Sequence, residues 1–178
     1  GIGTQEVTVQ ILGDSFVNGA FFRDALLSKN YIPGIKLVGL RNIKNEEGQY
    51  DEGRGGWTVK KYFEIPKGEM TSYHGYMQPV GEYRYWGSCE FWKNCYKVIN
   101  GELTDTEIVY NCGRYDQCIT KFDKETGYLA APKKNDLMYD NARGSYMVYT
   151  EKKWKNVEVD ERKWAFNYRK YLDMWNLD

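Results

Sequence analysis

The sequence lacks a long apolar run, and no stretch approaches the roughly 20 residues that a membrane-spanning helix needs. The N-terminal GIGTQEV has neither the basic start nor the apolar stretch of a signal peptide, although prior removal of such a peptide would leave the same sequence. Excess charge is also lacking, since 25 basic and 25 acidic residues cancel. Because no Lys/Arg-rich stripe is present to neutralise a row of phosphates, nucleic acid is not an expected partner.

Cysteine is limited to one short window, which contains Cys89, Cys95, Cys112 and Cys118. Their two Cys-x5-Cys spacings differ from the short knuckle of structural zinc sites, and no histidine lies nearby, so no metal is expected. Two disulfides are the favoured interpretation, and they imply an oxidising compartment. With disulfides, the protein is expected to be secreted or periplasmic. Without them, it is expected to be cytoplasmic. Buried free cysteines are the alternative.

Residues 7–65 carry the pattern of an α/β unit. The apolar residues of VTVQIL alternate as in a β-strand, and those of FFRDALL fall at helical spacing. IKLVGL at 35–40 then predicts a second strand. A strand, a helix and a strand with short connections predict a β-α-β unit with parallel strands.

The rest of the chain has two further parts, and its total of 178 residues suits one domain. Residues 66–159 contain much Gly, Asn, Asp and Tyr and only short apolar runs, which indicates an irregular, partly β insertion. Residues 160–178 predict an amphipathic helix that needs a surface to cover. Its apolar face would hold Trp164, Tyr168, Tyr171, Leu172 and Trp175.

A possible nucleophile stands where the first strand meets the following helix, in ILGDSFVNG. Ser15 would be exposed there, close to free backbone N–H groups that can hold an oxyanion, and Gly13 allows a tight turn. The structural alternative is that Asp14 or Ser15 only caps the helix, since both residue types are favoured caps.

A second glycine-rich stretch, DEGRGGWTVKKY at 51–62, follows the second strand. Together, ILGDSFVNG and EGRGGWT resemble the first two sequence blocks of the SGNH/GDSL hydrolases, which are esterases and acylhydrolases. The resemblance covers residues 7–63, with a weaker similarity in FDKETGYL and FNYRKYLDMWNLD. It implies a flavodoxin-like three-layer α/β/α fold, incomplete in this chain.

The resemblance also implies roles for individual residues. Ser15 would be the nucleophile, with its own backbone N–H as one oxyanion donor and that of Gly56 as a second. Asp14 would order the loop and do no chemistry. Arg54 and Trp57 would line the cleft, or else serve only in packing and at the surface.

The sequence departs from the family pattern in its third block and its base. The family has Gly-x-Asn-Asp at a strand end, whereas the only Asn-Asp pair here, Asn135-Asp136, follows no strand-like run. The single histidine, His74, lies outside the Asp-x-x-His motif that supplies the base. We therefore expect the gene to continue beyond residue 178 with both motifs, and the chain alone to be inactive.

The function implied is that of a serine esterase without a cofactor, removing short acyl groups from a carbohydrate. The carbohydrate part depends on the aromatic-rich YHGYMQPVGEYRYWG, whose rings could instead fill a core. The alternative function is a noncatalytic module that binds carbohydrate or protein.

Overall fold

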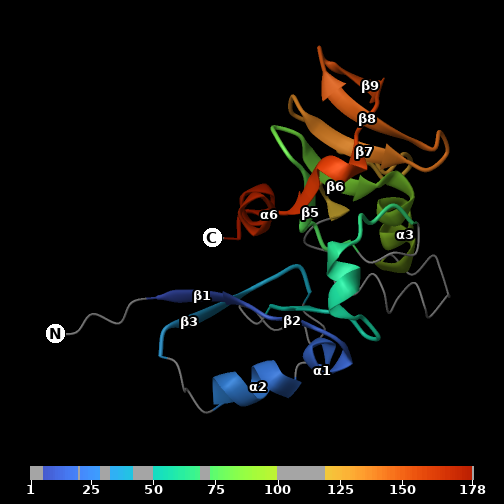
Figure 1. The fold of residues 1–178 in the computed structure, drawn as a ribbon. Helices are drawn as coiled ribbons and strands as arrows, with labels where there is room; N and C mark the ends of the chain where they lie inside the picture. The colour runs from blue at the N-terminus through green and yellow to red at the C-terminus, as the bar shows by residue number, and fades with distance from the viewer. Residues whose placement is uncertain are drawn as a thin grey trace.

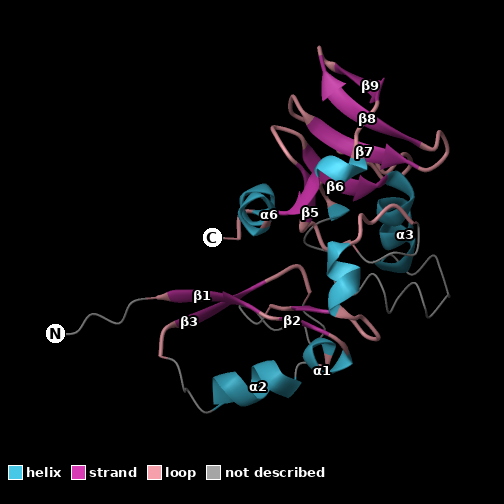
Figure 2. Ribbon diagram, in the orientation of Figure 1, coloured by secondary structure: helices cyan, strands magenta, loops and turns pink. Residues whose placement is uncertain are grey.

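The structure is a computed structural model that describes residues 6–19, 21–28, 33–41, 50–68, 73–99 and 119–177. Within these residues, the strands form three two-stranded sheets and one four-stranded sheet, with short helices around them (Figure 2).

The predicted β-α-β unit is confirmed. Strand β1 (Val7–Gln10) pairs in parallel with β3 (Ile35–Val38), and helix α2 (Phe21–Ser28) lies between them in the chain. In Figure 1 this unit forms the lower part of the molecule. The alternating apolar residues of β1 and the helical spacing of the FFRDALLS segment were therefore sufficient to predict these elements.

A second parallel pair continues the first strand. After β1, the short strand β2 (Leu12–Gly13) pairs in parallel with β4 (Glu52–Gly53). The chain then enters α1 (Ser15–Asn18), which is a single helical turn.

The upper part of the molecule is a four-stranded sheet in the order β6-β7-β8-β9. Strand β6 (Arg84–Ser88) is parallel to β7 (Asp136–Asp140), whereas β8 (Ser145–Thr150) and β9 (Lys153–Val157) continue in antiparallel pairing. Helix α3 (Cys89–Ile99) follows β6 directly. The segment expected to be an irregular insertion thus forms the largest sheet among the described residues.

The C-terminal segment is not one helix, so that prediction is wrong. A 3-10 turn η2 (Glu161–Lys163) leads into β10 (Trp164–Phe166), which pairs antiparallel with β5 (Met77–Pro79). Only α6 (Tyr168–Trp175) is helical, and it begins where the Asn167 side chain accepts a hydrogen bond from the N–H of Lys170 at 2.9 Å. The backbone pairing with β5, distant in sequence, outweighs the local helical pattern around Trp164.

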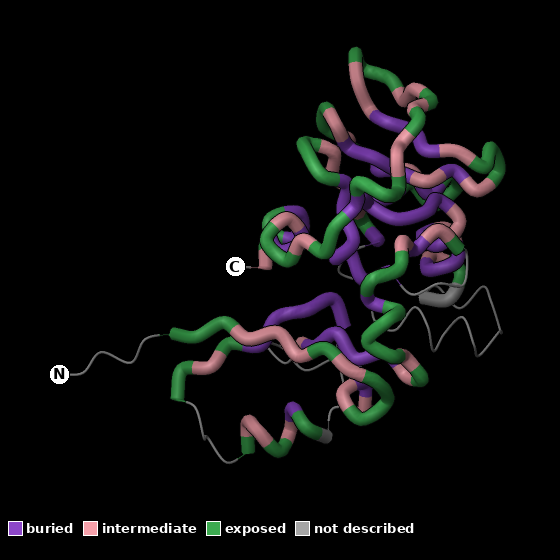
Figure 3. The backbone as a smooth tube through the Cα atoms, viewed as in Figure 1, coloured by how far each residue is buried: buried purple, intermediate pink, exposed green. Residues whose placement is uncertain are grey.

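The aromatic core covers α6. Tyr171, Leu172 and Trp175 are buried, and the Trp175 ring lies 5.1 Å from that of Trp86. Figure 3 shows buried residues in the upper sheet, α3 and α6, and also along residues 37–41 and 51–54 of the lower part. The apolar face of α6 therefore packs on residues of the 66–159 segment and needs no further strands.

The expected flavodoxin-like three-layer α/β/α fold is contradicted. The described residues form small mixed and antiparallel sheets with few short helices, and no central parallel sheet has helices on both faces. The physical reason is that β1 and β3 pair only with each other among the described strands, while the following segment builds its own sheet and core.

The cysteines do not support two disulfides. Cys89 carries a free, buried thiol at the start of α3, and Cys95 is buried in the same helix. Cys112 and Cys118 lie outside the described residues. Because Cys89 is free, the favoured interpretation that all four cysteines pair does not hold, and the argument for an oxidising compartment loses its basis.

Candidate active site

The two glycine-rich segments meet side by side. Gly13 pairs with Gly53 across β2 and β4, and the Arg54 N–H donates to the carbonyl of Gly13 at 2.8 Å. A Cβ atom on Gly53 would lie 2.2 Å from the backbone nitrogen of Asn18 in α1. Only glycine therefore lets β4 approach α1 this closely. The structure thus brings together the two segments that carry the resemblance.

Asp14, and not Ser15, caps α1. The Asp14 carboxylate accepts a hydrogen bond from the N–H of Phe16 at 3.0 Å, which is the N-cap interaction. The side chain of Ser15 is exposed and has no hydrogen-bond partner within the described part of the chain. The capping alternative for Ser15 therefore falls away, and its hydroxyl faces solvent.

Gly56 lies in a tight turn after β4. The N–H of Trp57 donates to the carbonyl of Arg54 at 3.1 Å, which closes a four-residue turn from Arg54 to Trp57. Gly56 is the third residue of this turn and has a φ of 72°. A positive φ at this position is what a type II turn requires. The N–H of Gly56 takes no part in the closing hydrogen bond of the turn, so it suits the predicted role of an oxyanion donor.

Arg54 does not line a cleft. Its side chain is buried and forms an ion pair with the equally buried Glu52 at 2.7 Å. Glu52 also accepts hydrogen bonds from the Leu40 N–H at 2.7 Å and from the Tyr171 hydroxyl. A guanidinium held in this way fixes the turn from inside the protein. The packing interpretation of Arg54 is therefore the correct one.

Trp57 does line a cavity, together with Gly13 and Asp14. This cavity of about 490 Å³ will be called the β2 cavity. Its remaining lining residues are Leu12, Thr58, Val59, Tyr62, Phe63 and Phe166. Val59, Tyr62 and Phe63 belong to the 3-10 helix η1 (Val59–Phe63), the teal helical turn that lies between the lower unit and the upper sheet in Figure 1.

Sequence reasoning missed most of this lining. The η1 residues follow directly after the glycine-rich stretch, so their position in the sequence could have predicted that they line the cavity. Phe166 had no such signal, because it reaches the cavity only through the pairing of β10 with β5.

His74 is a structural residue. Its Nδ1 accepts from the Tyr76 N–H at 3.1 Å, so Nε2 carries the proton and donates to the carbonyl of Glu64 at 3.0 Å. Burial, followed by the positive charge of Arg54, lowers the pKa of His74 to about 3. Both nitrogens are thus engaged, and the ring is neutral at physiological pH. His74 cannot serve Ser15 as a base, as its place in the sequence indicated.

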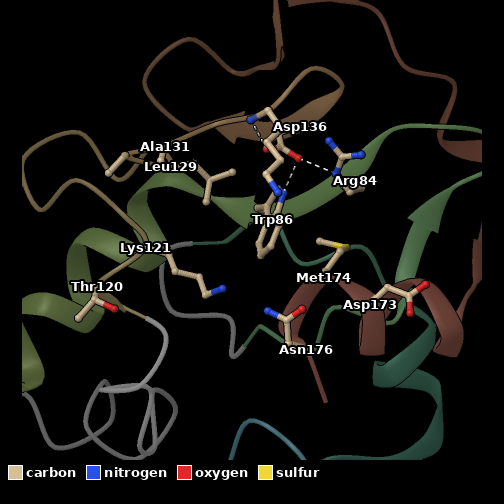
Figure 4. Close-up of a pocket in the computed structure, with 12 residues that line it drawn as sticks. Arg84, Trp86, Thr120, Lys121, Leu129, Ala131, Asp136, Asp173, Met174 and Asn176 are labelled. Carbon is tan, nitrogen blue, oxygen red and sulfur yellow. Dashed lines mark hydrogen bonds and ion pairs between the residues drawn. The ribbon is translucent and has the colours of Figure 1, made fainter. Parts of the chain in front are cut away.

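Asp136 of the Asn135-Asp136 pair, which did not fit the family's third block, lines a different cavity of about 550 Å³ (Figure 4). Asn135 has a φ of 71°, and β7 begins after it, not before it. The buried Asp136 carboxylate accepts from Arg84 Nε at 2.8 Å, from Trp86 Nε1 at 3.0 Å and from the Lys133 N–H at 2.7 Å. Its lone pairs and charge are therefore used in joining β6 to β7.

Most aromatic residues of YHGYMQPVGEYRYWG lie in the core. Tyr73, Tyr76, Tyr85 and Trp86 are buried and belong to the core. The hydroxyl of Tyr73 donates to the carbonyl of Tyr85 at 2.6 Å, so its polar tip is also engaged. The interpretation that these rings fill a core is therefore favoured, and the carbohydrate substrate stays a prediction without support from them.

Within the described ranges, no three His, Cys, Asp or Glu residues gather as metal ligands would. None of the helices in the same residues has the length and apolar character to cross a membrane. Comparison of the chain with known protein families, with curated proteins and with solved structures gives no match.

Proposed function

We propose that this chain carries the nucleophile and part of the oxyanion site of a serine esterase. The observation that supports the proposal is the parallel pairing of β2 with β4. This pairing brings the exposed Ser15 and the turn at Gly56 onto adjoining segments, beside the β2 cavity.

The proposed reaction is transfer of an acyl group to Ser15 and then to water. The Ser15 oxygen forms a bond to the ester carbonyl carbon, and the backbone N–H groups of Ser15 and Gly56 hold the resulting oxyanion. The carbon–oxygen bond to the alcohol then breaks, and the alcohol takes up a proton. Water releases the acid from the acyl-enzyme and restores the hydroxyl.

A general base is needed to remove the proton from Ser15, because a serine hydroxyl is a weak nucleophile. His74 is excluded by its burial, and no Asp-x-x-His motif occurs in these 178 residues. The proposal therefore places the base on sequence outside this chain, and the experiment uses the protein as its gene encodes it.

A fluorophosphonate probe tests the proposal directly, because it forms a covalent bond only with an activated serine. We expect peptide mapping by mass spectrometry to find one adduct, on Ser15, and Ser15→Ala to abolish it. Ser28 is a matched control, since it is also an exposed serine and its hydroxyl donates to the Ala25 carbonyl. Equal labelling of Ser28, or no labelling of Ser15 in a folded protein, would overturn the esterase proposal.

The second candidate function is ligand binding without cleavage. It is favoured by one specific observation: within the described residues the Ser15 hydroxyl has no hydrogen bond to a base, and the one histidine, His74, is buried. A folded protein that binds esters, leaves them intact and does not react with the probe would establish this second function in place of the first.

A further inference from the structure

The β2 cavity offers an apolar surface beside Ser15. Its aliphatic and aromatic side chains come from β2, from Trp57 before η1, from η1 and from β10. Val59 and Phe63 are apolar but remain 77% and 54% exposed, and neither contributes to the core. The Phe63 and Phe166 rings lie 5.1 Å apart and form one continuous aromatic surface. Exposed apolar groups gathered in a hollow are typical of a site that binds an apolar ligand.

Two polar groups of this lining already have hydrogen-bond partners within the protein. The Tyr62 hydroxyl donates to the carbonyls of Gly13 at 2.8 Å and Glu52 at 2.5 Å, so its ring is what the tyrosine presents. The Asp14 carboxylate caps α1 through the N–H of Phe16. A ligand in the cavity therefore meets mainly carbon, and it gains affinity mainly by burying apolar surface.

The cavity is also close to the proposed nucleophile. Asp14 lines it, and Ser15 is the next residue, so their Cα atoms are about 3.8 Å apart. An ester carbonyl held at Ser15 has its acyl substituent within reach of the cavity. An acetyl group is too small to use this surface, because only one methyl group would be buried.

We propose that the β2 cavity binds the acyl part of the ester, and that this acyl group is apolar and ring-bearing, as in a benzoyl or cinnamoyl ester. This inference rests on the proposed function and names its substrate class. The aromatic rings of Trp57, Tyr62, Phe63 and Phe166 select a flat ring through stacked and edge contacts. The short acyl group expected from the sequence is replaced by a larger one.

The first experiment measures kcat/KM of the full-length protein for 4-nitrophenyl acetate, hexanoate and cinnamate. We expect the rate to rise by up to about fourfold per added methylene, and cinnamate to be preferred over hexanoate. Phe63→Ala should lower the cinnamate-to-acetate ratio of kcat/KM by about three- to tenfold.

Phe22→Ala is the matched control, because Phe22 is 57% exposed in α2 and does not line the cavity. This variant should keep the wild-type ratio. If acetate is the best substrate, or if both variants change the ratio equally, the inferred acyl pocket is wrong while the esterase proposal stands.

A binding measurement separates the failure of the pocket from that of the proposed function. The non-cleavable ether 4-nitrophenyl cinnamyl ether is titrated by calorimetry into wild type, Phe63→Ala and Phe22→Ala. Binding weakened only in Phe63→Ala, without any ester turnover or probe reaction at Ser15, would keep the cavity as a ligand site and overturn the esterase proposal. Absence of both binding and turnover would overturn both.

Discussion

The guanidinium of Arg54 and the carboxylate of Glu52 lie 2.7 Å apart, and both side chains are almost completely buried. Removing one partner leaves the other charged, buried and uncompensated. We therefore expect Arg54→Met to lower the free energy of unfolding by about 3–5 kcal/mol in urea denaturation.

The double variant Arg54→Met/Glu52→Gln is the control for this prediction. It removes both charges, so it should be more stable than Arg54→Met alone, even though one additional side chain is changed. A double variant less stable than the single one would show that the charge pair is not the source of the loss.

The buried His74 predicts a loss of stability in acid. An unfolded histidine binds a proton near pH 6.5, whereas the folded pKa is about 3, so the unfolded state binds more protons between these values. The free energy of unfolding therefore keeps its full contribution from His74 above pH 6.5. Below that pH this contribution decreases, by up to about 1.4 kcal/mol per pH unit. Urea titrations from pH 7 to pH 4 should show this slope. In His74→Gln the slope should be shallower, and an unchanged slope would assign the effect to other groups.

Lys170 holds a loop of the upper part in place. Its ammonium donates to the carbonyls of Pro79 at 3.0 Å, Gly81 at 2.7 Å and Tyr83 at 2.9 Å. Because all three hydrogen bonds are lost together, Lys170→Met should lower the free energy of unfolding by about 2 kcal/mol. Lys155→Met is the control, since Lys155 has only a surface ion pair with Glu151, and it should change stability by less than about 0.5 kcal/mol.

Cys89 should be unreactive in the native protein and reactive after unfolding without reductant. Burial raises the pKa of its thiol from 9.0 to about 12, which lowers its thiolate fraction about a thousandfold. Alkylation with iodoacetamide, followed by peptide mapping, measures both states. A need for reductant before Cys89 reacts in denaturant would restore the disulfide interpretation that the structure replaces.

Local patterns were enough to predict the N-terminal elements. The alternation of Val7 and Val9 and the apolar IKLV segment correspond to strands that do pair in parallel. The resemblance likewise indicated that the GDS and GRGG segments belong together, and β2 and β4 join them. These features depend on residues close in sequence or on one short pairing.

The core and most of the cavity depend on contacts that no local pattern encodes. Trp92 stacks on Phe122 at 4.0 Å, and Trp164 belongs to a strand whose partner residues are 77–79. The spacing of Trp164 and Tyr168 fits a helix equally well, so only the partner strand decides between the two. Aromatic residues suit both a core and a ligand face, and the burial that distinguishes these uses is a property of the folded chain.

The hydrogen bond between the Tyr171 hydroxyl and Glu52 joins residues 119 positions apart. Contacts of such long range form late and slow the folding of a domain, because a large loop must close before they contribute. During synthesis the segment with Ser15 emerges first, yet Glu52, which forms part of the pairing that orders it, gains this partner only once α6 has been made. Assembly of the proposed catalytic turn is therefore expected to follow synthesis of α6, so Ser15 would gain its ordered surroundings long after its own segment has been made.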